Sequence, residues 1–442
     1  MAIVKQSAIQ SIDAVENALE SARKRYLLLH PKSREAFEES KKYMPGGNTR
    51  TVLFHTPFPL RIQSGSVNRV TDADGNQYIN LLGEYTAGLF GHSNPVIRKA
   101  IDAALDRGLN LSGHNPDEIT LAKLVCERFP SIENVRFTNS GTEANLLAIS
   151  AARHHTSRDK VMVFEGGYHG GLLYFGGGGI PINAPFDYVI APYNDIVNTE
   201  KLIIRYGDEL ACVLVEPMQG SAGCIPGNHE FLAMLSKYCK ESDIVLIFDE
   251  VMTSRLSSAG AQGKTGIIPD MTTLGKYIGG GMSFGAFGGR REIMEMFDPT
   301  LPGSIPHAGT FNNNSLTMAA GVAAMRDVIT DQNLTTLNSL GDHLRDGLNK
   351  AFDSANARLT ATGSGSIIGI HPVFGAVNST ADLVEKDDRL LELLFLLLLE
   401  RGYYIARRGF IALMLDIGED EINGFLAAVQ EILDEYQSVF KV

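Results

Sequence analysis

Cysteine is scarce in this chain of 442 residues, which contains only Cys126, Cys212, Cys224 and Cys239. These residues form no CxxC pair, and no histidine lies near them at the spacing of a zinc site. The sequence therefore indicates no metal site. We expect the cysteines to be buried free thiols in a reducing compartment.

Long apolar runs are also missing. The N-terminal sequence MAIVKQSAIQSIDAVENALE lacks the apolar core of a signal peptide and contains acidic side chains. The most apolar helical stretch, LELLFLLLLE at residues 391–400, is too short to cross a bilayer, which takes about 20 residues. We therefore expect no membrane partner, a cytoplasmic location, and a buried helix at 391–400.

Positive charge is deficient, with 39 lysine and arginine residues against 51 aspartate and glutamate residues. The formal net charge of −12 argues against nucleic acid or an anionic membrane as the main partner, because both attract basic surfaces. The net charge does not exclude a local basic pocket that binds a small anionic molecule.

Complete nucleotide-binding motifs are missing as well. Gly263-Lys264-Thr265 resembles the end of a phosphate-binding loop, but Ser258 stands where that motif needs a glycine. Gly363-Ser364-Gly365 is followed by Ile368 in place of the third glycine of a dinucleotide-binding motif. We therefore expect neither ATP nor dinucleotide binding through these segments.

What the chain does contain is the make-up of an ordinary globular protein, with 44% apolar and 20% charged residues. From residue 94 to about 257, short apolar runs rich in β-branched residues alternate with helical patterns. The runs are VRFTNS, KVMVFEG, FDYVIAP, ACVLVEP and DIVLIFDE. This alternation predicts an α/β domain with a large, mostly parallel sheet and helices on both faces. Ligands of such folds bind outside the carboxyl ends of the strands, so the residues that follow the strands carry the most information.

The flanking segments have a different pattern. Helices are predicted for residues 11–29 and 33–43, followed by short extended segments in which Asp74-Gly75 signals a hairpin turn. After about residue 330, the helices predicted are 331–355, 381–400 and 418–438, with the short strands SIIGIHP and GFIALML between them. We therefore predict an N-terminal segment at 1–70 that belongs to a small lobe, a large α/β domain at 71–330, and a C-terminal α+β domain at 331–442.

Ser140-Gly141-Thr142-Glu143 follows the strand VRFTN directly and opens a helix. Free backbone N–H groups at the start of a helix bind phosphate, and Gly141 permits close approach. The alternative is a capping box, with Ser140 as the N-cap and Glu143 three residues later. The two interpretations are compatible.

Tyr168-His169-Gly170 follows the strand KVMVFE. An aromatic ring at this position could stack on a flat heteroaromatic ligand. The alternative is a loop tyrosine that only packs against its neighbours.

Asp249-Glu250-Val251 ends the strand DIVLIF. A carboxylate after an apolar strand is costly to desolvate unless a cation pairs with it, and a protonated pyridine nitrogen is such a cation. A helix-capping or metal-binding aspartate is the alternative.

Lys276 is the one charged residue in the glycine-rich stretch TTLGKYIGGGMSFGAFGG. Apolar surroundings disfavour the ammonium form of lysine and make the amine nucleophilic, which Schiff-base formation with an aldehyde requires. Together the four features supply a phosphate cradle, a ring stacker, a pyridinium partner and a Schiff-base amine. Pyridoxal 5'-phosphate requires this set, so we predict this cofactor, with Lys276 and Asp249 as the catalytic residues.

From YMPGGNTR to RRGFIALML, almost the whole chain resembles the class III aminotransferases of fold type I. The resemblance implies that Lys276 holds the cofactor and that Asp249 contacts its pyridine nitrogen. The other implied cofactor contacts are Ser140, Gly141 and Thr142 at the phosphate, Val251 and Tyr168 at the ring, and Glu216 and Gln219 of VEPMQG nearby.

The same resemblance implies a partner. Thr310 of HAGTFNNN matches a threonine that reaches the phosphate of the neighbouring subunit's cofactor. The family therefore leads us to expect a homodimer with shared active sites.

Ser221 helps to identify the branch of the family that the chain resembles. In the ornithine and 4-aminobutyrate branch, a glutamate at this position pairs with a C-terminal arginine, so that gate is absent here. Glutamate-1-semialdehyde aminomutases usually lack the glutamine that is present as Gln219. The motifs look very like those of β-amino acid aminotransferases, notably the enzymes that act on β-phenylalanine.

In that group one arginine early in the chain and one near its end bind carboxylates, and these match Arg50 and Arg408. A guanidinium group fits a carboxylate in a bidentate way. The resemblance assigns Arg50 to the carboxylate of the β-amino acid and Arg408 to that of the keto acid, and we expect Val52 and Tyr85 to line an apolar pocket. Two alternatives stay open: Arg407 in place of Arg408, and a structural ion pair for either arginine.

The sequence thus predicts a transaminase that moves the amino group of a β-amino acid, such as β-phenylalanine, to 2-oxoglutarate or pyruvate. The amino donor is expected to displace Lys276, whose freed amine then acts as general base and acid. An aminomutase, which moves an amine within one substrate and needs no acceptor, is the nearest alternative. A cofactor-binding protein without catalysis is a more distant one.

Overall fold

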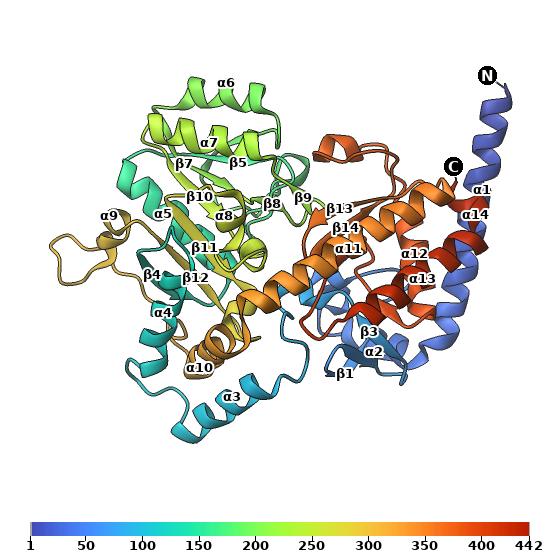
Figure 1. Ribbon diagram of the computed structural model, residues 1–442, viewed down its shortest axis with the longest axis horizontal. Coiled ribbons are helices and arrows are strands. Elements are labelled where there is room, and N and C mark those ends of the chain that lie inside the picture. Colours follow the sequence, from blue (N-terminus) through green and yellow to red (C-terminus); the bar gives the residue numbers. More distant parts are fainter. Residues whose placement is uncertain (1, 442) are drawn as a thin grey trace.

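A computed structural model describes the backbone of residues 2–441 and the side chains of residues 14–441. A seven-stranded sheet forms the centre of the larger lobe (Figure 1). Its strand order is β4-β12-β11-β10-β7-β5-β6, and every neighbouring pair is parallel except the two pairs that β12 makes. The strands are β4 (Asn134–Thr138), β5 (Lys160–Phe164), β6 (Asp187–Ala191), β7 (Leu210–Val215), β10 (Val245–Asp249), β11 (Met271–Gly275) and β12 (Gly285–Gly289). The predicted large, mostly parallel sheet is confirmed.

Alternate residues along these strands face two different layers of helices. Val161 and Val163 of β5 pack in a cluster with α5 (Gly141–Thr156). Met162 and Phe164 pack in another with α6 (Ile196–Tyr206) and α7 (His229–Glu241). Because both faces of the sheet are covered, its inner strands consist of nearly continuous apolar runs.

Strand β12 is not identified by its sequence pattern, because GAFGG contains mostly glycine. The glycines are needed where β12 approaches neighbouring backbone. A Cβ atom on Gly285 would lie 2.1 Å from the carbonyl oxygen of Ser140, and one on Gly288 would lie 2.5 Å from that of Asn134. The strand therefore runs close beneath the start of α5.

The smaller lobe joins the two ends of the chain. β3 (Gln77–Asn80) pairs in parallel with β15 (Tyr403–Tyr404), and β1 (Ile62–Ser66) and β2 (Arg69–Asp72) complete this sheet. A second small sheet contains β13 (Thr360–Ser364), β14 (Ile367–His371) and β16 (Phe410–Ala412). The first helix, α1 (Ala2–Leu29), lies against α12 (Asp388–Glu400), as the blue and red ribbons of Figure 1 show.

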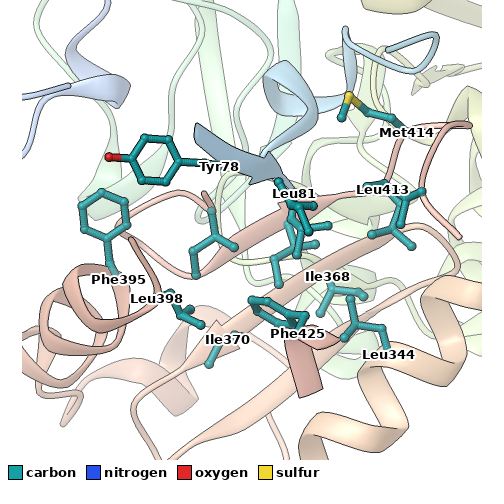
Figure 2. Close-up of a cluster of buried hydrophobic side chains, with 14 of the residues drawn as sticks. Tyr78, Leu81, Leu344, Ile368, Ile370, Phe395, Leu398, Leu413, Met414 and Phe425 are labelled. Atoms are coloured by element: carbon teal, nitrogen blue, oxygen red, sulfur yellow. The ribbon is translucent and has the colours of Figure 1, made fainter. Parts of the chain in front are cut away.

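The core of this lobe lies between its sheets and helices. Figure 2 shows Tyr78 and Leu81 facing Phe395 and Leu398 of α12. Further side chains of the same cluster come from α11 (Asp331–Ala355), β14 and α13 (Glu419–Glu435), and those labelled in Figure 2 are Leu344, Ile368, Ile370 and Phe425. Residues distant in the sequence thus share one core.

The remaining elements are short or peripheral. The other helices are α2 (Pro31–Ser40), α3 (Pro95–Arg107), α4 (Pro116–Arg128), α8 (Gly260–Thr265), α9 (Arg291–Met294), α10 (Ser315–Ala323) and α14 (Gln437–Phe440). A two-stranded sheet is formed by β8 (Met218–Gln219) and β9 (Ile225–Pro226).

Most predicted elements are present, with shifted ends. The hairpin turn at Asp74-Gly75 joins β2 to antiparallel β3, and Gly75 has φ +95° there. The helix predicted at 381–400 begins only at Asp388, because the capping box of Ser379 and Asp382 closes a separate 3-10 turn first. The division into 1–70, 71–330 and 331–442 stays a prediction.

The buried helix expected at 391–400 is confirmed, since residues 390–399 of α12 are all buried. None of the helices in the described residues combines the length and apolar character that a membrane crossing needs. The cysteines are free thiols, and Cys212, Cys224 and Cys239 are buried whereas Cys126 is half-buried.

Candidate active site

A cavity of about 670 Å³ opens at the carboxyl ends of the parallel strands. The loops after β4, β5, β10 and β11 meet there, as expected for a sheet of this kind. Predicted site residues that line it are Arg50, Ser140, Gly141, Thr142, Tyr168, Glu216, Asp249, Val251 and Lys276. The structure thus brings together residues from six separate motifs.

Lys276 follows β11 directly and has a left-handed backbone, with φ +56°. This conformation is unfavourable for a residue with a side chain, and such strain is concentrated at functional sites. Burial lowers the pKa of Lys276, and the positive charge of Arg50 lowers it further, while Glu84 and Asp249 act in the opposite direction. The cavity therefore favours the neutral, nucleophilic amine.

Asp249 is buried at the end of β10, with 5% of its surface exposed. Its Oδ2 atom accepts hydrogen bonds from His169 Nδ1 at 2.8 Å and from Asn145 Nδ2 at 2.9 Å. Its Oδ1 atom accepts one from the backbone N–H of Val251 at 3.0 Å. These donors stabilise a carboxylate in an apolar setting and fix its direction.

His169 and Asn145 are the residues that the sequence analysis missed. Both are nearly fully buried, and the Asn145 side chain also accepts a hydrogen bond from Thr273 Oγ1 at 2.6 Å. They stand inside two motifs already singled out, GGYHGG and TNSGTEAN. A polar residue inside such a motif indicates a functional contact. The sequence does not reveal that contact, because the partner, Asp249, is remote along the chain.

At the start of α5 the helix cap is confirmed, and the phosphate-binding interpretation stays a prediction. Ser140 Oγ accepts a hydrogen bond from the backbone N–H of Glu143 at 3.2 Å, so it caps the helix. At the same time Ser140, Gly141 and Thr142 line the cavity. The first N–H groups of a helix have no partner within it, so they are available to an anion.

Glu216 and Tyr168 are linked through the backbone. Glu216 Oε1 accepts a hydrogen bond from the N–H of Tyr168, and Oε2 accepts one from the N–H of Gly220, both at 2.9 Å. Burial raises the pKa of Glu216 to about 7, although the neighbouring His169 lowers it in part. Tyr168 itself is 42% exposed, with its side chain at the cavity.

Gln219 is buried next to this group but does not line the cavity. Its Nε2 donates to the carbonyl oxygen of Glu165 at 2.9 Å. Its Oε1 has no hydrogen-bond partner among the described residues although it is buried. A buried acceptor of this kind usually indicates a partner that is missing from the polypeptide itself.

The two predicted substrate arginines differ in their partners. Arg50 lines the cavity and forms an ion pair with Glu84. Arg408 Nη1 donates to the carbonyl oxygen of Ser221 at 2.9 Å and to its Oγ at 3.1 Å. Across the described part of the chain, no carboxylate lies within ion-pair distance of Arg408.

Arg407 points elsewhere. Its Nη2 donates at 2.7 Å to Glu392, a buried carboxylate of the smaller lobe. Arg408, by contrast, lies over the ring of Tyr85 at 5.2 Å. Unlike Arg50, Arg408 is not among the residues that line the cavity, but its charge acts on Lys276, whereas Arg407 is bound to Glu392. The geometry therefore favours Arg408 over Arg407.

Three further predicted residues lie outside the cavity lining. Tyr85 is buried, and its hydroxyl donates to the carbonyl oxygen of Val52 at 3.0 Å, while the Val52 side chain is exposed. Thr310 is exposed and lines a separate cavity of about 480 Å³ together with Phe311. In a single chain, Thr310 is thus not brought to Lys276.

A model of the aminotransferase class-III family matches residues 54–176 and 181–433. The chain belongs to the class III aminotransferases. These enzymes use pyridoxal phosphate, so the chain is a transaminase with this cofactor, as the sequence analysis predicted.

Individual class III relatives align with this chain over nearly its whole length. The chain is 49% identical over 416 residues to a beta-phenylalanine transaminase of Variovorax paradoxus, covering 94% of this chain and 96% of the relative. It is 38% identical over 423 residues to a glutamate-1-semialdehyde 2,1-aminomutase of Lachnoclostridium phytofermentans, covering 91% and 99%.

Among solved structures, a beta-phenylalanine aminotransferase from Variovorax paradoxus has a TM-score of 0.95 at 48% identity, with 96% of this chain and 99% of that chain covered. The predicted fold type I architecture is therefore confirmed.

The cavity fits the cofactor of this class III enzyme. A Cβ atom on Gly141 would lie 2.9 Å from Val251 Cγ2, so only glycine leaves the helix start and Val251 undisturbed. The buried Asp249 and the buried Lys276, both of which line the cavity, provide a counter-ion and an amine. A phosphorylated pyridine aldehyde needs these groups.

Proposed function

We propose that the amino donor is a β-amino acid such as β-phenylalanine, and that the acceptor is a keto acid such as 2-oxoglutarate or pyruvate. The observation that carries this proposal is a pair of arginines near Lys276. Arg50 lines the cavity, and Arg408, which lies over the ring of Tyr85, is near enough that its charge lowers the pKa of Lys276 as that of Arg50 does. Transamination must hold the carboxylates of two substrates in turn. The relative at 49% identity that is described as a beta-phenylalanine transaminase supports the choice of donor.

The residues that would hold the cofactor follow from the cavity. Ser140, Gly141 and Thr142 would bind the phosphate through the start of α5, and Asp249 would pair with the pyridine nitrogen. The residues assigned to its ring and edge are Val251, Tyr168, Glu216 and Gln219. When bound, pyridoxal phosphate supplies an electron sink for the bond that breaks at the substrate carbon.

Lys276 would move the proton. Its pKa is lowered by burial, so the neutral Nζ can take a proton from the substrate carbon that bears the amine and later return it. His169 and Asn145 hold the Asp249 carboxylate in one orientation through Oδ2. They act as positioning residues for the group that pairs with the ring nitrogen.

Arg50 would bind the carboxylate of the β-amino acid, and Arg408 that of the keto acid. In a β-amino acid the carboxylate lies one carbon further from the amine than in an α-amino acid. Two guanidinium groups at different positions match these two distances without one arginine having to serve both.

We further propose a homodimer in which Thr310 faces the cofactor phosphate of the other subunit. In one chain Thr310 is exposed and lines a cavity apart from Lys276. Exposed apolar side chains surround it, with Phe311 at 55% and Leu111 at 47% exposure. Apolar surface of this kind is typical of a covered interface.

An aminomutase is the second candidate, because one relative at 38% identity carries that description. The two are separated by a half-reaction without acceptor. β-Phenylalanine should bleach the visible absorbance of the holoenzyme, and 2-oxoglutarate or pyruvate should restore it. An absorbance that β-amino acids leave unchanged would discard the proposed donor, and turnover of a single substrate without any keto acid would establish the aminomutase.

A further inference from the structure

Glu392 is a charged residue inside the apolar face of α12. Residues 390–399 of this helix are all buried, and Glu392 is 2% exposed. A buried carboxylate is costly unless cations and hydrogen-bond donors surround it. Its partners therefore show what it does.

Three remote segments converge on this carboxylate. Arg23 of α1 reaches Oε1 through Nε and Nη2, both at 2.7 Å. Thr56 Oγ1 donates to the same oxygen at 3.0 Å, and Arg407 Nη2 donates to Oε2 at 2.7 Å. Hydrogen bonds from Arg407 and Arg23 oppose the effect of burial and leave the pKa of Glu392 lowered, so the group is a carboxylate.

Two of these partners belong to the segments that carry the substrate arginines. Thr56 ends a stretch that begins at Arg50 and includes the single turn Thr51–Leu53. Arg407 precedes Arg408 in a tight turn, in which the N–H of Gly409 donates to the carbonyl oxygen of Ala406 at 2.9 Å. Arg407 points to Glu392 and Arg408 to Ser221, so an anchored Arg407 fixes the turn that presents Arg408.

Glu392 with its partners Arg23, Thr56 and Arg407 forms a cluster that we call the anchor. No second carboxylate contacts Thr56 or Arg407 in this anchor, among the described residues. His55 packs edge-on against Phe395 of α12, with ring centroids 4.8 Å apart, and burial lowers its pKa to about 4, so it is neutral. Glu16 lies 3.6 Å from Arg23 and is half-exposed. His55 Nδ1 hydrogen-bonds to the backbone carbonyl oxygen of Thr56 at 3.2 Å, which adds a second contact in this segment but no charge. Glu16 forms ion pairs with Arg23 and Arg389, each at 3.6 Å, and none with Arg407 among the described residues.

We propose that Glu392 is a positioning residue that fixes the positions of Arg50 and Arg408 relative to each other, through its hydrogen bonds to Thr56 and Arg407. The proposal rests on the assignment of these arginines to the substrate carboxylates. Glu392 does not line the cavity and does not contact Lys276 or Asp249, so its effect reaches the reaction only through carboxylate binding. It therefore acts on the donor and the acceptor together.

The test is a Glu392→Gln variant of the holoenzyme, which keeps the shape of the side chain and removes its charge. We expect the KM of both β-phenylalanine and 2-oxoglutarate to rise by about tenfold, with kcat and the visible absorbance of the cofactor within about twofold of wild type. Glu16→Gln removes the other carboxylate beside Arg23 and should leave both KM values unchanged.

Two milder variants test the contacts of Glu392 to Thr56 and to Arg407 separately. They keep the proposal testable even if Glu392→Gln fails to fold. Thr56→Val removes one hydroxyl and should raise the KM of the donor by about fivefold while sparing the acceptor. Arg407→Lys should raise the KM of the acceptor and spare the donor. Unchanged KM values in these variants, or a loss confined to kcat, would overturn the proposal.

Variants of the arginines themselves distinguish this proposal from the one on which it rests. If Arg50→Ala and Arg408→Ala leave both KM values unchanged, the carboxylate assignment fails, and the role of Glu392 fails with it. If the arginine variants raise KM but the anchor variants do not, only the role of Glu392 is wrong.

Discussion

At the scale of single residues, the chemistry of the site depends on which charges are compensated. Lys276 is buried, and both Arg50 and Arg408 act to lower its pKa further. Asp249 is buried too, but three donors surround it. The cavity thus disfavours the charged form of the amine and surrounds the carboxylate with hydrogen-bond donors, which is the combination that a pyridine aldehyde cofactor needs.

Replacement of Lys276 by alanine should abolish turnover, because no other amine takes its place at the end of β11 among the cavity residues. Circular dichroism should show an intact fold, since the substitution removes only a side chain at a cavity. Lys264→Ala, which removes an exposed lysine, should retain full activity. Full activity in Lys276→Ala would contradict the mechanism.

The pairing of Arg50 with Glu84 has a consequence for donor affinity. On the proposed assignment of the two arginines, the donor carboxylate would displace Glu84 from Arg50, whereas the acceptor carboxylate would displace only Ser221 from Arg408. Both partners of the pair are about half-exposed, so the ion pair contributes at most about 1 kcal/mol. We expect Glu84→Gln to lower the KM of β-phenylalanine about two- to fivefold and to leave that of 2-oxoglutarate unchanged. Steady-state kinetics with each substrate varied in turn checks this, and an increase in the donor KM would show that Glu84 instead orients Arg50.

Glu216 should give the cofactor-free protein a particular pH dependence of stability. Burial raises its pKa from the ordinary value of 4.5 to about 7. Between these values the folded protein retains a proton that the unfolded chain releases, so stability falls as pH rises through this window and is constant above it. The loss is roughly 3 kcal/mol at most.

Glu216→Gln should remove this dependence. The variant loses hydrogen-bond quality at Tyr168 and Gly220 at every pH, but its unfolding free energy relative to wild type should increase between pH 5 and pH 8. Urea denaturation at a series of pH values measures the difference. Parallel curves for the two proteins would contradict the assigned pKa.

At the scale of elements, the start of α5 packs closely against two other segments, the loop after β10 and strand β12. Gly141 lies against Val251, and β12 passes beneath Ser140. Each close approach depends on a missing side chain, and Gly141 and Val251 both line the cavity. A single methyl group is therefore enough to disturb the contact between α5, β10 and β12.

Gly141→Ala should weaken cofactor binding by about tenfold, because its Cβ would lie 2.9 Å from Val251 Cγ2 and push that side chain into the cavity. Gly171→Ala is a matched control, since a Cβ there meets nothing within 4 Å. Titration of the cofactor-free variants with pyridoxal phosphate, followed by absorbance, measures both. Equal affinities for the two variants would refute the cradle at Gly141.

The turn from Gly83 to Thr86 is a second element with unusual geometry. Gly83, Glu84, Tyr85 and Thr86 all have positive φ values, between 50° and 79°. This turn directs Glu84 to Arg50 and places the Tyr85 ring beneath Arg408. Consecutive left-handed residues are costly, so the surrounding contacts must maintain them.

At the scale of the whole molecule, the site depends on both ends of the chain. The segment with Arg50 comes from the N-terminal part and Arg408 from the C-terminal part, and the pairing of β3 with β15 joins these parts in one lobe. The cavity itself belongs to the larger lobe. On the proposed roles of Arg50 and Arg408, substrate affinity depends on how the two lobes pack, whereas the proton transfer assigned to Lys276 is local.

The proposed dimer leads to a prediction at this scale. Phe311→Asp should place a charge in the exposed apolar surface around Thr310 and shift the protein from dimer to monomer. Because Thr310 is assigned to the cofactor phosphate of the other subunit, the monomer should also lose pyridoxal phosphate more readily on dialysis. Sedimentation equilibrium and the visible spectrum report the two effects, and an unchanged dimer that retains its cofactor would contradict this arrangement.

The sequence by itself determined those features that depend on local pattern. Buried strands have to be apolar, and catalytic groups follow them at the carboxyl edge of a parallel sheet. Lys276, Asp249 and the SGTEAN segment could therefore be located from their neighbours in the chain. The family resemblance extended this to Arg50, Arg408 and Thr310, whose proposed roles no local pattern reveals.

Tertiary structure alone decided which residues are partners. His169 and Asn145 are ordinary members of their motifs until folding brings them to Asp249, and Arg407 differs from Arg408 only because Glu392 is buried beside it. The glycines of β12 conceal a strand because close backbone approach, and not side-chain burial, requires them. Pairing across hundreds of residues follows from the packing of the whole chain, and this is the information that periodicity along the sequence does not contain.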